Sequence, residues 1–140
     1  MVRVEAQIFE DQRAEFDLLM QELLTGARVG VQSLERERAA VTARALEALT
    51  LILDAVRQHP GTGQARRLVH FLAGLYNGSD YPFDLSDLRP LDARLANACL
   101  DYLNYDRLAI CDLDRHWDDC DRELRGWIRR NAIRAVASRP

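Results

Sequence analysis

The 140-residue chain has the length of a single domain, and its 48% hydrophobic and 29% charged residues are typical of a globular protein. No apolar run approaches the ~20 residues of a membrane-spanning helix, and the first residues lack the apolar core of a secretion signal. We therefore expect a cytoplasmic protein with no membrane association and with three reduced cysteines. All nineteen basic residues are arginine, which excludes chemistry that depends on a lysine amine.

The charge is unevenly distributed, although the net charge is only −3. Residues 101–123 contain eight acidic residues and three arginines, whereas residues 125–140 contain five arginines and no acidic residue. Paired helical faces explain such segregation, and a bipolar docking surface is the alternative. Because no basic stripe runs along the chain, we expect no direct binding of duplex nucleic acid.

The first predicted helix covers about residues 7–25. Its apolar side chains recur every three or four residues on one face, at Phe9, Phe16, Leu19, Met20 and Leu23. Gly26 and Gly30 then predict a turn, because glycine is the commonest residue where a helix is interrupted.

A second, longer helix is predicted over about residues 34–58, with Ser33 as its N-cap. Its core face comprises Ala45, Leu46, Leu49, Ile52, Leu53 and Val56. The two helices would make residues 1–58 an N-terminal helical hairpin. Leu18 and Leu51 face outward in this arrangement and are a candidate contact with another chain, including a second copy.

A third helix is predicted over about residues 63–77. Pro60 ends the preceding helix, and the Thr62 hydroxyl is expected to cap the new one. Asn77 and Gly78 predict a left-handed helix end. The predicted buried face comprises Ala65, Leu68, Val69, Leu72, Leu75 and Tyr76.

The rest of the chain predicts an aromatic loop over residues 78–85 and two further helices. Asp84 or Ser86 is a candidate cap for a single turn, and Pro90 suits the start of a helix that ends near Asn104. The last helix begins near Asp112, with a buried face of Leu113, Trp117, Cys120, Leu124, Trp127 and Ile128.

These elements predict one all-α domain, a compact bundle of five to six helices. Helical spacing places eight large side chains in its core: Leu49, Leu53, Leu68, Leu72, Leu75, Leu100, Trp117 and Leu124.

The middle of the chain carries a combined motif. Its pieces are Thr62-Gly63-Gln64, Arg66-Arg67, Tyr76-Asn77, Phe83-Asp84-Leu85 and Leu91-Asp92. With this motif, residues 61–130 resemble an uncharacterised bacterial domain of unknown function, which is associated with plasmids, integrative elements and phages. The resemblance implies no catalytic residues. Helix caps, turns and packed aromatic residues are a structural explanation for the same positions.

The sequence contains residues that resemble two kinds of metal site, and we expect neither site to bind a metal. Cys99, Cys111, His116 and Cys120 would make a zinc site, but no close pair of cysteines is present. Asp112, Asp114 and Glu123 fit three positions of a calcium loop, but Trp117 stands where that loop needs glycine. We therefore predict no metal and no cofactor.

The sequence contains two further candidate sites. Thr62, Arg66 and Arg67 at a helix N-terminus are a candidate anion site, although the lysine of a phosphate-binding loop is absent. His70 is a candidate general base, but the sequence shows no nucleophile paired with it. We therefore expect that the protein is not an enzyme.

The expected function is that of a non-enzymatic protein-binding module whose partner is a host protein or complex. Given the resemblance, the specific form is an inhibitor or modulator of a host defence complex, with an anti-CRISPR-like role. Acidic side chains would imitate nucleic-acid phosphates, although the pairs Asp118–Arg122 and Asp121–Arg125 account for part of the charge. The predicted contact residues are Asp114, Asp118, Asp121, Arg125 and Arg129. The alternatives are a regulatory domain that binds a small molecule or anion, and an accessory protein of an integrative element.

Overall fold

The computed structural model describes residues 13–136, except for the side chains of residues 28 and 29. These residues contain four α-helices, two short 3-10 helices and no strand, which confirms the all-α class with fewer helices than predicted. The helices are α2 (Arg13–Gln58), α3 (Gly63–Tyr76), α4 (Ala93–Asp106) and α5 (Cys120–Arg130), and the 3-10 helices are η1 (Leu85–Leu88) and η2 (Leu113–His116). Within residues 13–136, none of the helices is both long and apolar enough to cross a bilayer.

The chain divides into two units between Ala39 and Ala40, inside the 46-residue helix α2. The turn predicted at Gly26 and Gly30 is wrong, since α2 is continuous through both glycines. A helical glycine costs only about 1 kcal/mol relative to alanine, and the flanking residues, which include no proline, favour a helix. The N-terminal hairpin is therefore absent, and Ser33 lies within α2 instead of capping a helix.

The predicted buried face of residues 7–25 is also wrong where the structure describes it. Phe16 and Leu23 are 48% and 68% exposed, and Leu19 and Met20 are exposed as well. Phe9 lies outside the described residues.

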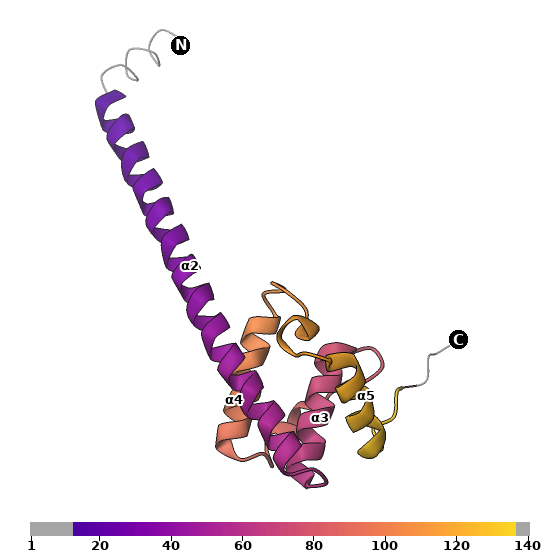
Figure 1. Cartoon of the computed structure of the whole chain (residues 1–140). Coiled ribbons are helices and arrows are strands. Elements are labelled where there is room, and N and C mark those ends of the chain that lie inside the picture. Colours follow the sequence, from indigo (N-terminus) through magenta and orange to yellow (C-terminus); the bar gives the residue numbers. More distant parts are fainter. Residues whose placement is uncertain (1–12, 137–140) are drawn as a thin grey trace. The chain divides into compact units, whose positions relative to one another are not determined.

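Between Ala40 and Val136, the end of α2 gathers with α3, α4 and α5 into one unit (Figure 1). Their buried side chains form one hydrophobic core. Six of the eight predicted core residues are buried: Leu49, Leu53, Leu68, Leu72, Trp117 and Leu124. Leu75 packs partly buried against this core, while Leu100 is 51% exposed and its prediction was wrong. The buried aromatic residues Phe71, Tyr102 and Tyr105 lie outside the predicted core set.

Helix α2 ends at Gln58 as predicted, and Gly61 turns the chain with φ +84°. The Thr62 hydroxyl accepts a hydrogen bond from the Ala65 amide at 3.1 Å, which confirms the predicted cap of α3. The prediction of a left-handed end for α3 is wrong. Asn77 has φ −151°, and its side chain accepts from the Asp80 amide at 3.1 Å.

Helix α4 begins later than predicted, because Asp92 rather than Pro90 positions its first turn. The Asp92 carboxylate accepts hydrogen bonds from the amides of Arg94 and Leu95, at 2.8 and 3.2 Å. In the same way, Asp84 accepts from the Ser86 amide, so Asp84 rather than Ser86 is the N-cap of η1.

The last predicted helix is interrupted after η2. Asp119 adopts φ +59°, a left-handed conformation, and α5 begins at the next residue. All six side chains predicted to be buried there are buried. Helices α3 and α5 pack against each other, and Ile133 is buried beyond the end of α5. The Val136 amide then donates to the Asp80 carbonyl at 2.8 Å, which joins the end of the described chain to the loop after α3.

Candidate functional site

Three polar side chains meet between α4 and η2. Tyr105 lies in the last turn of α4, Cys111 in the connection and His116 at the end of η2. The chain reverses in this connection through Ala109, whose φ of +51° is unusual for a residue with a side chain. This turn brings Cys111 back beside the end of α4.

Each member of this cluster is within hydrogen-bond distance of the other two. The Tyr105 hydroxyl lies 2.7 Å from His116 Nε2, and Cys111 Sγ lies 3.0 Å from the same nitrogen. The third distance, between the hydroxyl and the sulfur, is also 3.0 Å. Tyr105 is buried, while Cys111 and His116 are half-buried.

Burial, and next the hydrogen bond with Cys111, raises the pKa of Tyr105 to about 12. Its hydroxyl therefore keeps its proton near neutral pH. A thiol beside an imidazole and a permanent hydroxyl donor is an arrangement that can hold a sulfur anion. We call Tyr105, Cys111 and His116 the thiol cluster.

In the sequence, Cys111 and His116 stand out only as possible members of a zinc site. The structure brings these two together but places Cys99 and Cys120 in the hydrophobic core. Burial raises the pKa of these two thiols to about 12 and about 11 respectively. Across residues 13–136, no three histidine, cysteine or acidic side chains are grouped closely enough to hold a metal.

The calcium-loop interpretation is contradicted by the partners of Glu123. This carboxylate accepts a hydrogen bond from Trp117 Nε1 at 2.7 Å and forms an ion pair with Arg57 at 2.6 Å. Asp112 and Asp114 belong to the start of η2, so the carboxylates of these two residues and of Glu123 are not grouped around a common point.

His70, the candidate general base, forms a hydrogen bond within the fold. Its Nε2 lies 3.0 Å from the Pro82 carbonyl oxygen.

The five predicted contact residues are all exposed, but the three acids do not share one helix. Asp114 lies in η2, Asp118 in the connection and Asp121 in α5, because Asp119 breaks the helix between them. The predicted Asp118–Arg122 pair is wrong, since Arg122 pairs with Asp119 at 3.2 Å.

The predicted Asp121–Arg125 pair is confirmed at 3.0 Å. The Tyr76 hydroxyl also donates to Asp121, and this bond, followed by the charge of Arg125, lowers the pKa of the carboxyl. Tyr76 was predicted to be buried but is 37% exposed, which leaves its hydroxyl in reach of α5. Arg129 is exposed in the last turn of α5.

The candidate anion site is partly occupied by internal contacts. Thr62 uses its hydroxyl for the cap of α3, and it also donates to the His59 carbonyl at 2.9 Å. Arg66 donates from Nε to the Asn131 carbonyl at 3.2 Å. Arg67 is half-buried, with one guanidinium nitrogen close to Gly63. Two of the three groups therefore stabilise the fold.

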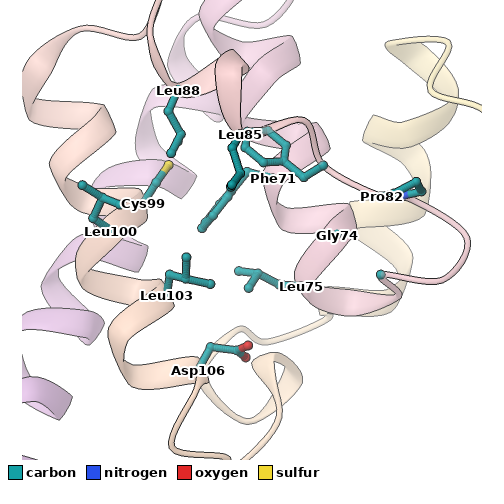
Figure 2. Close-up of a pocket in the computed structure, with 12 residues that line it drawn as sticks. Phe71, Gly74, Leu75, Pro82, Leu85, Leu88, Cys99, Leu100, Leu103 and Asp106 are labelled. Atoms are coloured by element: carbon teal, nitrogen blue, oxygen red, sulfur yellow. The ribbon is translucent and has the colours of Figure 1, made fainter.

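An apolar pocket of about 270 Å³ opens between α3, α4 and the loop that joins them (Figure 2). Leu75 and Leu103 point toward each other across it, and Asp106 lies at one end. Burial, and next the charge of Asp112, raises the pKa of Asp106. Leu100 lines this pocket, which explains why a residue with core spacing is half exposed.

The family of unknown function DUF7673 matches residues 46–132. No curated protein and no solved structure matches the chain. The match begins inside α2, so it extends further toward the N-terminus than the residues 61–130 expected from the motif. Because it covers more than half of the 140 residues, this chain belongs to the DUF7673 family.

Proposed function

We propose that this protein is a non-enzymatic protein-binding module that acts in the cytoplasm. The observation that carries the proposal is the exposure of α2 between Arg13 and Ala39. Every side chain described in this segment is exposed, and eight of them are large and apolar. A helix of this composition is stabilised when a partner covers its apolar side chains.

The apolar and small residues of this segment follow a heptad pattern. Spacings of four and three residues alternate through Phe16, Met20, Leu23, Ala27, Gly30 and Leu34. This is the spacing of the contact positions in a helical coiled coil, where each side chain inserts between residues of the facing helix. Gly26 and Gly30 have nothing within 4 Å of an added Cβ, so a second helix has room to approach closely.

The partner that fits this pattern is a second copy of the chain in antiparallel orientation. When Ala27 of one copy faces Gly30 of the other, Leu23 faces Leu34 on both sides of the centre. At the flanking positions of the same register, Asp17 faces Arg38 twice, so opposite charges are paired.

A parallel arrangement is less favourable, because it places identical charged residues of the two copies opposite each other. The next contact position after Leu34 is Glu37, and two Glu37 carboxylates would repel. The segment from residue 13 to 39 contains four arginines and five acidic residues, which gives a charge of −1 and little general repulsion between copies.

Sedimentation velocity of the full chain over a range of concentrations tests this proposal. The wild type is expected to associate with increasing concentration. Leu23→Glu with Leu34→Glu is expected to remain monomeric, because the register places these carboxylates opposite each other. The control, Gln21→Glu with Gln32→Glu, adds the same charge outside the contact positions and is expected to associate like the wild type.

A charge exchange tests the orientation. Asp17→Arg alone should weaken association, and Asp17→Arg with Arg38→Asp should restore it, because the two positions face each other only in antiparallel copies. A wild type that stays monomeric at all concentrations would overturn self-association. Equal effects of the leucine and glutamine variants would contradict the contact positions.

The narrower role that we attach to this module is modulation of a host defence complex. It rests on the resemblance to a domain encoded on mobile elements and on the exposed carboxylates Asp114, Asp118 and Asp121. Expression in bacteria with active CRISPR interference should raise the plating efficiency of a targeted phage. Reversal of the three acids to arginine should abolish this increase, and no increase with the wild type would exclude the role.

An anion-binding regulatory domain is the alternative, centred on Thr62, Arg66 and Arg67. The hydrogen bond from Arg66 to the Asn131 carbonyl disfavours this alternative, because it engages one of the two arginines within the fold. A melting temperature that rises with phosphate in the wild type, but not in Arg66→Glu with Arg67→Glu, would favour this alternative.

A further inference from the structure

We propose that Cys111 is a reactive thiol, which small hydroperoxides oxidise to a sulfenic acid with His116 as the proton acceptor and Tyr105 as a hydrogen-bond donor. The proposal concerns a modification site in the thiol cluster. It is independent of the contact surface on α2.

The geometry fits the anionic form of the sulfur. A ring nitrogen carries either one proton or one lone pair, so the protonation of His116 Nε2 decides the direction of both of its hydrogen bonds. When Nε2 is protonated, it shares its proton between Cys111 Sγ at 3.0 Å and the Tyr105 oxygen at 2.7 Å, and the Tyr105 hydroxyl donates to the same sulfur at 3.0 Å. Both donors then converge on the thiolate.

Transfer of the Cys111 proton to His116 produces this state within the cluster. A thiolate beside an imidazolium is held by a charge-assisted hydrogen bond, which is stronger than a bond between neutral groups. The Tyr105 hydroxyl contributes the second bond without adding charge. Since the thiolate and not the thiol is the nucleophile, the cluster raises the reactivity of Cys111.

The reaction balances with the hydroperoxide as the oxidant. The Cys111 thiolate attacks one peroxide oxygen, the S–O bond forms and the O–O bond breaks. The sulfur loses two electrons, and the departing oxygen takes the proton from His116 to leave as water or an alcohol. Cys111 is left as a sulfenic acid, which an external thiol can reduce.

The other two cysteines are internal controls. Cys99 and Cys120 are 0% and 2% exposed, and no hydrogen bond to either thiol is described within residues 13–136. Cys111 is half-buried and is therefore more accessible to solvent than the other two cysteines.

The test uses the folded full-length protein, treated with hydrogen peroxide and with dimedone, which traps sulfenic acids. Trypsin cleaves after arginine and separates the three thiols, because Cys111 lies in residues 108–115, Cys99 in 95–107 and Cys120 in 116–122. Mass spectrometry of these peptides is expected to show dimedone on Cys111 at least ~10-fold faster than on the two buried thiols, since an ordinary cysteine is only a few per cent thiolate at pH 7.

Two variants separate activation from simple exposure. His116→Gln keeps a hydrogen-bond donor but removes the base, and it is expected to slow labelling of Cys111 by roughly 10-fold. Tyr105→Phe keeps the ring in the core and is expected to slow labelling less. Neither substitution lies in the Cys111 peptide, so the same ion is measured in all samples.

Labelling in urea is the control for intrinsic reactivity, and all three proteins should react equally there. If His116→Gln melts at a lower temperature than the wild type, the comparison is made with Tyr105→Phe. Equal labelling of the three cysteines in the folded wild type would overturn the proposal. So would unchanged labelling of Cys111 in folded His116→Gln.

Discussion

Arg57, in the last turn of α2, holds Glu123 of α5 through two hydrogen bonds, from Nη2 to Oε1 at 2.6 Å and from Nε to Oε2 at 3.2 Å. The residues are 66 positions apart, so this pair ties the end of one helix to another across the compact unit. Trp117 Nε1 donates to the same carboxylate at 2.7 Å, which fixes its orientation.

Glu123→Gln is expected to destabilise the fold by about 1 kcal/mol, because it removes the charge but leaves an acceptor for Trp117. The estimate is modest, since the side chain of Arg57 is 43% exposed. Urea unfolding measures the change. Arg122→Gln is the control. It breaks the more exposed pair with Asp119 and should cost less than ~0.5 kcal/mol. Equal losses of unfolding free energy in both variants would show that the Arg57–Glu123 pair stabilises the fold no more than an exposed ion pair does.

The same carboxylate predicts a pH dependence. Hydrogen bonds from Arg57 lower the pKa of Glu123 below its ordinary 4.5, so the folded state favours the ionised form. Its contribution is present above the unfolded pKa and is lost as the pH falls through the lower folded pKa. The stability difference between wild type and Glu123→Gln should therefore be constant near neutral pH and shrink below about pH 4.5. A difference that grows with acid would contradict the assignment.

Leu72→Ala and Leu100→Ala are a matched pair that tests the core. Leu72 is 0% exposed, and its truncation should cost ~2–5 kcal/mol because it leaves a cavity. Leu100 is 51% exposed on the wall of the apolar pocket, and its truncation should cost less than about 1 kcal/mol. Denaturant unfolding with fitted m-values measures both. Similar costs would place Leu100 in the core.

Gly74→Ala and Gly126→Ala are expected to change stability in opposite directions. A Cβ on Gly74 would lie 3.1 Å from the Tyr81 carbonyl oxygen and 3.3 Å from Phe83 Cβ, so the loop must shift at a cost of about 1–3 kcal/mol. A Cβ on Gly126 would meet only a terminal nitrogen of Arg130 at 3.3 Å, which can move. That helix should gain up to ~1 kcal/mol from alanine. Thermal unfolding compares the two, and stabilisation by Gly74→Ala would show that the loop yields freely.

Much of the fold could be predicted because its signals are local. The Thr62 cap and the buried face of α5 follow from residues within one or two helical turns. The prediction of a turn at Gly26 and Gly30 was wrong, because the preference of glycine for turns is weak and neighbouring residues override it. The predicted burial of Leu100 was wrong, because helical spacing places a residue on one face of a helix but does not show whether another element covers that face.

The thiol cluster could not be predicted for a different reason. Cys111 and His116 are five residues apart and on no shared helix, and their approach depends on the backbone reversal at Ala109. An alanine with positive φ has no sequence signature of the kind that glycine supplies. The predicted Asp118–Arg122 pair was wrong for a similar reason, because the helix breaks at Asp119 and Arg122 pairs with Asp119 instead.

Residues on both sides of the family match belong to the folded interior, and this limits where the chain can be shortened. The family match ends at residue 132, yet Ile133 is 8% exposed and Val136 still donates to Asp80. At the other end the match starts at residue 46, although Val41 and Ala45 are buried in the same core. An expression fragment trimmed to the family limits would therefore remove parts of the hydrophobic interior at both ends. The smallest fragment that keeps this interior whole runs from residue 40 to residue 136.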